Sequence, residues 1–377
     1  MPVETVAAVL HAFGEPHRIE PVELRDPGPQ EVLVRVLAAG VCHSDVGQAD
    51  GEWAFPLPAV LGHEGAGIVE AVGSEVGSVS VGQQVVLNAA PGCGACAHCA
   101  AERPIRCQES LDAMTEGRLV TGPTPISGSE GPIATYSLLS CFAAHAIVGE
   151  SSAIPLPDGV APDVAALIGC AVITGFGAAT ETIAVASGSR GAVVGVGGVG
   201  VNAIQGARLN GARTIAALDV SPERLENARR FGATETVDTR DDDVVDALRG
   251  RARHEGYDWT IVAVGDEAAV RLGVELTRPG GTTVVVGLLP ERQPVPIDLL
   301  DLVTYEKTIL GSAYGSVSPW RLMPRIARLY LEGGLLLDEL VTEHLPLEAI
   351  DEAFDLSRAG RGLRPVLTPA DGEHKAA

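Results

Sequence analysis

The chain has 377 residues, of which 46% are hydrophobic and 20% charged, which is the composition of a folded protein long enough for about two domains. Its 49 acidic and 27 basic residues give a formal charge of −22, which excludes nucleic acid and anionic membrane surfaces as general partners. The N-terminal segment MPVETVAAVLHAFGEP lacks the features of a secretory signal, and no uninterrupted apolar run of about 18 residues predicts a membrane span.

The segment from Val6 to about Asp158 has the pattern of all-β structure. Short apolar runs alternate there with Pro-Gly, Gly-His and Val-Gly turn signals. The predicted strands include Val32–Ala38, Gly67–Val72 and Gln84–Leu87.

From about Pro162, apolar strands alternate with helical segments. Strands are predicted at Gly191–Val196, Thr214–Leu218, Trp259–Val264 and Thr283–Gly287. Helices are predicted at Gly198–Leu209 and at Pro222–Phe231, the second with Ser221 as its N-cap. Such alternation with apolar strands is typical of a parallel, doubly wound sheet.

After about Ser312 the chain returns to a mixed pattern. The predicted elements are a helix at Pro319–Glu332, a strand at Leu340–Leu345, a helix at Leu347–Arg358 and a strand at Arg364–Leu367. We expect this part to rejoin the first domain, because it would otherwise lack a partner sheet. We also expect a helix start at Asp241–Asp243 and a frayed tail at Pro369–Ala377.

Four of the seven cysteines lie within fifteen residues, in the segment PGCGACAHCAAERPIRC. They are Cys93, Cys96, Cys99 and Cys107. Four thiolates from one loop can close a tetrahedron around a structural Zn²⁺ ion. An iron–sulfur site, unligated cysteines and a nucleic-acid-binding zinc ribbon are the alternatives, although nothing basic surrounds the cluster. The cysteine pattern without a signal sequence favours a reducing cytoplasm over disulfides.

A second set of metal-binding side chains is scattered along the chain. Cys42, His63 and Cys170 each lie beside glycines, in GVCHSD, GHEGAG and IGC. Two sulfurs and one imidazole form an open zinc site that leaves a position for water or substrate, the set used by alcohol dehydrogenase. The alternative is that the cysteines are small buried side chains and the histidine is part of the core.

A glycine-rich run follows one predicted strand and begins a predicted helix. It contains Gly195, Gly197, Gly198, Val199 and Gly200. In this context the run is a dinucleotide fingerprint, in which backbone N–H groups and the helix N-terminus approach a pyrophosphate. Asp219, after the next strand, would bind the ribose hydroxyls and favour NAD over NADP, whereas Arg224 could tolerate NADP. A glycine turn beside a solvated aspartate is the alternative.

Taken together, these motifs resemble the zinc-containing medium-chain alcohol dehydrogenases over nearly the whole chain. GVCHSD, GHEGAG, the four-cysteine segment, IGCAVITGFGA, GVGGVG and ALD occur in the family's order. GVGGVGVNAIQGA and YEKTILGSAYG look most like the nicotinoprotein or aryl-alcohol branch. The resemblance implies an α/β protein, with a GroES-like β-rich catalytic domain (1–172, completed by 313–377) and a Rossmann domain (173–312).

The resemblance also implies a role for each matching residue. Cys42, His63 and Cys170 would hold a catalytic zinc, and Cys93, Cys96, Cys99 and Cys107 a structural zinc. Ser44 would bind the substrate oxygen and begin a proton relay, Asp45 would orient the histidine ligand, and Glu64 would lie behind the zinc. His43 and Arg364 would lie near the cofactor pyrophosphate.

Three departures from the family pattern concern the relay, the pocket and the substrate. Gly47 stands where many members have a histidine at the outer end of the relay. Trp53 and Ala89 match pocket positions, which suggests a reshaped cavity with a flat aromatic wall. Leu111 stands where the glutathione-using formaldehyde branch has an arginine, which weakens that assignment. Cys141 matches no ligand position and is interpreted as a small buried side chain.

The resulting hypothesis is an enzyme that interconverts an alcohol and an aldehyde or ketone by hydride transfer to NAD, with two zinc ions per chain. The alternatives are a nicotinoprotein that keeps NAD(H) bound and uses an external acceptor, a thiol-adduct formaldehyde dehydrogenase, and a non-catalytic binding protein with the same fold. We expect small-molecule substrates and a homodimer, with a tetramer as the alternative.

Overall fold

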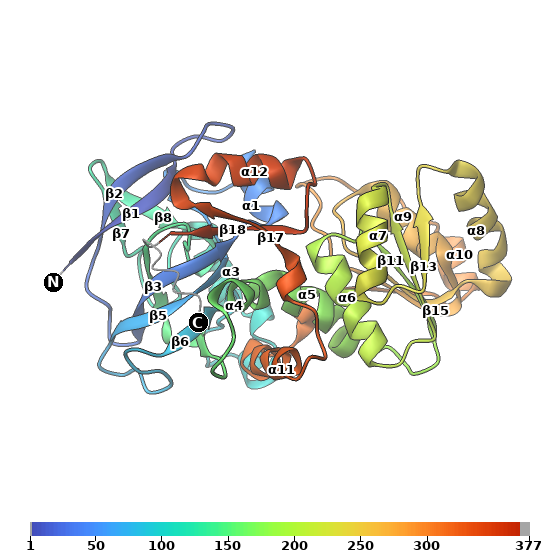
Figure 1. Ribbon diagram of the computed structural model, residues 1–377, viewed down its shortest axis with the longest axis horizontal. Helices are drawn as coiled ribbons and strands as arrows, with labels where there is room; N and C mark the ends of the chain where they lie inside the picture. The colour runs from blue at the N-terminus through green and yellow to red at the C-terminus, as the bar shows by residue number, and fades with distance from the viewer. Residues whose placement is uncertain (1, 370–377) are drawn as a thin grey trace. The chain divides into compact units, whose positions relative to one another are not determined.

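The computed structural model describes residues 2–369, without the side chains of residues 251 and 253 (Figure 1). The chain forms two compact units, of which the first combines Met1–Cys170 with Ser318–Ala377 and the second is Ala171–Val317. The boundaries expected from the sequence differ from these by a few residues. The tail predicted to fray is Pro369–Ala377, of which Pro369 is described and buried, whereas residues 370–377 lie outside the described part.

Unit 1 is built on two β structures. A closed barrel has the strand order β1 (Val3–Leu10), β2 (Arg18–Leu24), β7 (Ile126–Gly128), β8 (Gly131–Thr135), β4 (Ala59–Val60). A seven-stranded sheet has the order β10 (Ala153–Pro155), β6 (Gln84–Leu87), β5 (Glu64–Val72), β3 (Glu31–Gly40), β18 (Arg364–Thr368), β17 (Val341–Pro346), and β9 (His145–Gly149) also pairs with β3. The apolar side chains of β3 are buried except that of Leu37, which is half-buried, as expected of a central strand.

The C-terminal segment rejoins the first unit, as the sequence predicts. β18 pairs antiparallel with β3, with Val366 opposite Gly40 and Leu367 opposite Ala39. The helices of unit 1 are α1 (His43–Ala49), α2 (Ala97–Ala100), α3 (Gln108–Glu116), α4 (Pro162–Leu167), α11 (Pro319–Leu331) and α12 (Ile350–Arg358). This return places residues from both ends of the chain around one core.

The prediction of all-β structure from Val6 to Asp158 is wrong at α1, α2 and α3. Helix α1 forms because the Asp45 carboxylate, in its first turn, accepts the backbone N–H of the N-cap residue Cys42 at 3.0 Å. The segment is short and lacks a long apolar periodicity. Its capping residue, Asp45, belongs to the motif GVCHSD, which was interpreted only for metal binding, so the helix was not predicted. Helix α2 lies within the cysteine segment and contains Cys99, and α3 begins directly after Cys107; turn signals in this segment obscured both helices.

Unit 2 contains one parallel six-stranded sheet. Its order is β13 (Glu235–Asp238), β12 (Thr214–Asp219), β11 (Arg190–Val194), β14 (Tyr257–Val262), β15 (Thr277–Val285), β16 (Thr308–Gly311). The helices are α5 (Ile173–Gly177), α6 (Gly198–Leu209), α7 (Pro222–Phe231), α8 (Asp242–Glu255), α9 (Glu267–Leu276) and α10 (Leu299–Thr304). Numbered within the unit, this is the strand order 3-2-1-4-5-6 of the Rossmann fold, so the predicted fold class is confirmed.

The predicted elements of unit 2 differ from the observed ones mainly at their ends. Helices α6 and α7 have the predicted bounds, and the Ser221 hydroxyl caps α7 by accepting the Arg224 N–H at 3.4 Å. Strand β11 ends at Val194, two residues before the predicted end, because Gly195 turns the chain with φ +82°. Asp241 caps α8, as the predicted helix start implies.

One helical stretch, Pro162–Thr182, meets the length and hydropathy of a membrane span, contrary to the expectation from uninterrupted apolar runs. It consists of α4 and α5 with two π-helical turns, Ile168–Val172 and Ala178–Thr182. Because 83% of its most apolar window is buried, it has the pattern of a core helix.

Candidate metal and cofactor sites

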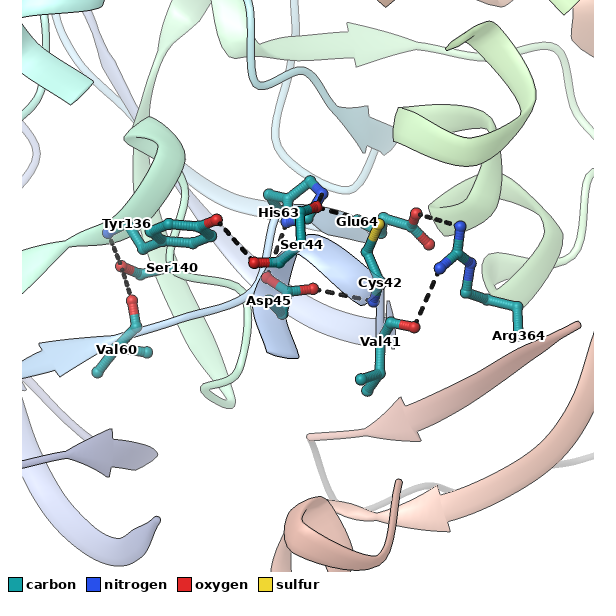
Figure 2. A network of polar contacts seen from close by, with 10 residues as sticks. All are labelled: Val41, Cys42, Ser44, Asp45, Val60, His63, Glu64, Tyr136, Ser140 and Arg364. Atoms are coloured by element: carbon teal, nitrogen blue, oxygen red, sulfur yellow. Dashed lines mark hydrogen bonds and ion pairs between the residues drawn. The ribbon is translucent and has the colours of Figure 1, made fainter. Parts of the chain in front are cut away.

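Four side chains in unit 1 converge from three separate parts of the sequence. Figure 2 shows three of them, Cys42, His63 and Glu64. Single ligand atoms of Cys42, His63, Glu64 and Cys170 all lie within 4.8 Å of one another, and all four side chains are buried. Cys42 precedes α1, His63 precedes β5, Glu64 begins β5, and Cys170 lies in the π-helical turn after α4. The three predicted zinc ligands are therefore brought together by the fold.

Asp45 determines how the His63 ring faces this cluster. Its Oδ1 lies 2.8 Å from His63 Nδ1, while its Oδ2 accepts the Cys42 N–H. The carboxylate therefore favours a proton on Nδ1 and leaves the Nε2 lone pair toward the cysteines. Burial opposes the charged imidazole, but the Asp45 carboxylate raises the pKa of His63 well above its usual value.

The cluster is suited to a soft divalent cation. A hydrogen bond from Cys170 and the nearby Arg364 charge lower the pKa of Cys42 well below the usual value, against the effect of burial. Burial raises the pKa of Glu64 to about 7, and neither of its buried oxygens has a hydrogen-bond partner among the described residues. Two sulfurs, an imidazole and a nearby carboxylate match the donors of catalytic zinc sites.

Arg364 lies behind this cluster. One guanidinium nitrogen donates to the Val41 carbonyl at 3.2 Å, and the other lies 3.3 Å from Glu64 Oε1. The side chain is only 5% exposed, so its charge partly offsets that of the buried Glu64. His43 is exposed at the start of α1. The cofactor roles expected of these two residues remain predictions.

The Ser44 hydroxyl lies at the edge of the predicted zinc site. It donates to Cys42 Sγ at 3.2 Å and is 3.4 Å from His63 Nε2. On its other side Figure 2 shows Tyr136, whose hydroxyl donates to the Ser44 carbonyl at 3.5 Å. The Tyr136 ring packs edge-on against those of His63 and Phe55. Tyr136 was not predicted from the sequence, because no motif or spacing connects it with Ser44, about ninety positions earlier in the chain.

The remaining residues singled out in unit 1 have varied environments. Trp53 is partly buried and Ala89 is 7% exposed, and whether they line a substrate pocket is still a prediction. Leu111 is exposed on α3. Cys141 is fully buried, and burial raises the pKa of its thiol well above the usual value, as suits a small core side chain.

The four-cysteine segment forms a second cluster in unit 1. Its sulfur atoms all lie within 4.8 Å of one another, and all seven cysteines are free thiols. Cys96 and Cys99 sulfurs are 3.5 Å apart, and the Cys93 N–H donates to Cys107 Sγ at 3.3 Å. Hydrogen bonds from Ser110 outweigh burial and lower the pKa of Cys107 to about 6. Four converging sulfurs without an oxygen donor fit a closed, tetrahedral zinc site.

The glycine-rich run of unit 2 forms a tight turn between β11 and α6. Gly195 has a positive φ, and Gly197 is the N-cap of α6. A Cβ at Gly200 would collide with the Gly195 carbonyl, so only glycine allows the helix to approach the turn so closely. The turn lies at the carboxyl end of the first sheet strand, beside the point where strand order reverses, which is where such sheets bind nucleotides.

Asp219, at the end of β12, faces this turn. Its oxygens accept the backbone N–H groups of Val196 and Ser221, both at 2.9 Å, and the side chain is 6% exposed. Arg224 lies 4.0 Å from the same carboxylate. A carboxylate held by two N–H groups at this position is suited to accept hydrogen bonds from ribose hydroxyls.

Comparisons with known proteins identify the family of this chain. A family model described as "Alcohol dehydrogenase GroES-like domain" matches residues 28–158, and one described as "Zinc-binding dehydrogenase" matches residues 198–328. A "Putative alcohol dehydrogenase D" of Mycobacterium tuberculosis is 34% identical, over 97% of this chain and 100% of that protein. The "NDMA-dependent alcohol dehydrogenase" of Amycolatopsis methanolica is also 34% identical, over 97% and 99%. The crystal structure of benzyl alcohol dehydrogenase from Acinetobacter calcoaceticus superposes with a TM-score of 0.90, at 32% identity and with 98% and 100% coverage.

Proposed function

The chain belongs to the zinc-containing medium-chain alcohol dehydrogenases, and from this premise we propose that Cys42, His63 and Cys170 hold the zinc ion of its active site. The family establishes zinc-dependent interconversion of an alcohol and an aldehyde or ketone with NAD(P). The observation that carries the residue assignment is the convergence of these buried ligand atoms within 4.8 Å, with Asp45 orienting the imidazole.

The side chains of unit 1 have different roles in the proposed reaction. A bound zinc ion supplies a Lewis acid for the alcohol oxygen, and NAD(P) supplies the hydride acceptor. Asp45 would keep the His63 Nε2 lone pair available to the ion, and the buried Glu64 and Arg364 would set the charge around the site. The Ser44 hydroxyl, next to two of the ligands, is placed to take the alcohol proton.

We propose a structural role for the second zinc ion, held by Cys93, Cys96, Cys99 and Cys107. Four converging sulfurs can occupy all four positions of a tetrahedral zinc ion, so this ion would stabilise the loop and take no part in the reaction. We also propose the domain assignment expected from the sequence, with residues 1–172 and 313–377 as the catalytic domain and 173–312 as the cofactor domain.

We propose that the cofactor is NAD and not NADP. The turn from Gly195 to Gly200, with Val199 at the start of α6, would bind the pyrophosphate, and Asp219 would repel a ribose phosphate. His43 and Arg364 are proposed as further contacts of the cofactor phosphates. The positive charge of Arg224, close to Asp219, would weaken the preference for NAD over NADP.

Asp219→Ala is expected to raise the Kd for NAD by about tenfold to a hundredfold and to bring the NAD and NADP affinities closer together. The reason is that the variant loses a charged acceptor for the ribose hydroxyls and removes the repulsion of a phosphate. Fluorescence titration of both cofactors measures the effect, and Asp238→Ala, on the neighbouring strand β13, is the control. An unchanged NAD-to-NADP ratio would contradict the ribose role.

We propose that Trp53 and Ala89 line the substrate pocket. This lining would favour an alcohol with a flat or bulky group. A second function, a nicotinoprotein that keeps NAD(H) bound and uses an external acceptor, is kept as the alternative because the chain is 34% identical to an enzyme named as NDMA-dependent. The formaldehyde alternative has less support, because Leu111 provides no charge for a glutathione adduct.

The deciding experiment is a panel of alcohols assayed with NAD, with NADP and with an artificial acceptor, together with zinc and nicotinamide analysis of the purified protein. We expect two zinc ions per chain and alcohol-dependent reduction of added NAD. Stoichiometric bound nicotinamide with turnover only on the artificial acceptor would establish the nicotinoprotein instead. Absence of turnover with every pair would refute the proposal.

We also propose that the protein is a cytoplasmic homodimer. The free thiols of all seven cysteines suit a reducing compartment. Strand β16 ends the sheet of unit 2, and Leu299, Leu300 and Val303 on the preceding α10 are each 68% or more exposed. An open sheet edge beside exposed apolar side chains is suited to pairing with a second copy. A monomeric mass by light scattering would contradict this.

A further inference from the structure

The end of helix α1 folds back over its own last turn. Gly51 has φ +82°, and its N–H donates to the Gln48 carbonyl at 3.1 Å. The next N–H, that of Glu52, donates to the Gly47 carbonyl at 2.9 Å. These two bonds form a Schellman motif, which brings the residue after the left-handed glycine back against the helix.

Glu52 occupies the space that a side chain at Gly47 would fill. A Cβ at Gly47 would lie 2.6 Å from Glu52 Oε2 and 2.9 Å from the ring of Trp53. Residues three apart in a helix share a face, with Cβ positions about 5–6 Å apart, so Gly47 lies one turn from Ser44 on the same face. The Glu52 carboxylate therefore lies over the face of α1 that carries the Ser44 hydroxyl.

Near this face of α1, the Glu52 carboxylate differs from those of Asp45 and Asp50 because it has no hydrogen-bond or ion-pair partner among the described residues. The Glu52 side chain is exposed. Asp45 is occupied in orienting His63, and Asp50 pairs with Arg358 at 2.6 Å. A free carboxylate in contact with water can accept a proton and release it to solvent.

We propose that Glu52 is the outer proton acceptor of the alcohol oxidation, receiving the proton that leaves through Ser44. This inference rests on the proposed function. Oxidation breaks the C–H and O–H bonds of the alcohol and forms C=O, with the C–H hydrogen and its electron pair going to NAD(P)⁺. The O–H proton passes to Ser44 as the Ser44 proton moves outward, directly or through water, to Glu52, which returns it to bulk solvent. Reduction uses the same path in reverse.

The first test compares wild type with Glu52→Gln, which keeps the shape of the side chain and removes its basicity. We expect kcat for alcohol oxidation to fall about tenfold, and proton release in a single turnover, followed with an indicator dye, to slow equally. Imidazole added at increasing concentration should restore the variant's rate, because a diffusible base can replace the missing acceptor. Glu52→Asp should keep most of the wild-type rate.

A second variant separates a proton-accepting role from a structural one. In Glu52→Ala/Gly47→His the alanine removes the closer of the two contacts with a Cβ at Gly47, the Trp53 ring shifts to accommodate the other, and the introduced imidazole should restore proton release relative to Glu52→Ala alone. The control is Glu15→Gln, an exposed carboxylate in the adjoining loop, where the Gly14 N–H contacts the end of α1. Wild-type rates in Glu52→Gln, or no response to imidazole, would overturn the inference while leaving the proposed function intact. An inactive wild type would overturn both.

Discussion

Replacing His63 with alanine is expected to lower kcat/KM for alcohol oxidation by at least about a thousandfold, while the fold and the binding of NAD in unit 2 are retained. The variant removes the one nitrogen donor of the proposed catalytic zinc site, and a Lewis acid contributes several kcal/mol of charge stabilisation to such a reaction. Steady-state kinetics, zinc analysis and NAD titration measure the three quantities separately.

The control for this variant is His344→Ala. His344 is half exposed on β17 and pairs with Asp163, away from the cluster, so its removal should leave kcat/KM and the zinc content unchanged. If His63→Ala kept wild-type turnover, the zinc mechanism at this site would be wrong. Loss of activity together with loss of the folded state would be recognised by circular dichroism, and Cys42→Ser then provides the smaller perturbation.

Replacing Cys99 with alanine should instead affect stability. The variant is expected to lose one zinc ion per chain and to lower the melting temperature by about 5–10 °C, because three sulfurs hold the ion poorly and the loop loses its cross-link. The kcat at a temperature where the protein remains folded should stay within a few-fold of wild type. Differential scanning calorimetry with metal analysis checks the result.

Cys141→Ala is the matched control for this effect. Cys141 is a fully buried cysteine outside both clusters, so its truncation should cost about 1 kcal/mol through lost packing and leave two zinc ions bound. A Cys99→Ala protein with an unchanged melting temperature would count against a structural zinc. A loss of activity equal to that of His63→Ala would count against the separation of the two roles.

Much of the fold was predictable because its signals are local. The helix starting at Gly198 follows directly from a glycine turn, and the α7 helix from a serine cap and a proline, so both have the predicted bounds. Helix α1 was missed because it is short and is capped by a residue interpreted as a partner of the metal site. Strand ends shifted where a single glycine, Gly195, turned the chain earlier than its apolar run suggested.

The sequence by itself determined which donors are available, since residue types and short spacings specify a four-sulfur cluster, a glycine turn and a family. Only the tertiary structure decided which distant side chains meet: Tyr136 beside Ser44, and Arg364 behind Glu64. The physical reason is that spacing along a helix or loop is set by local backbone geometry. The approach of distant segments depends instead on sheet pairing, such as that of β18 with β3, and on the packing of the whole core.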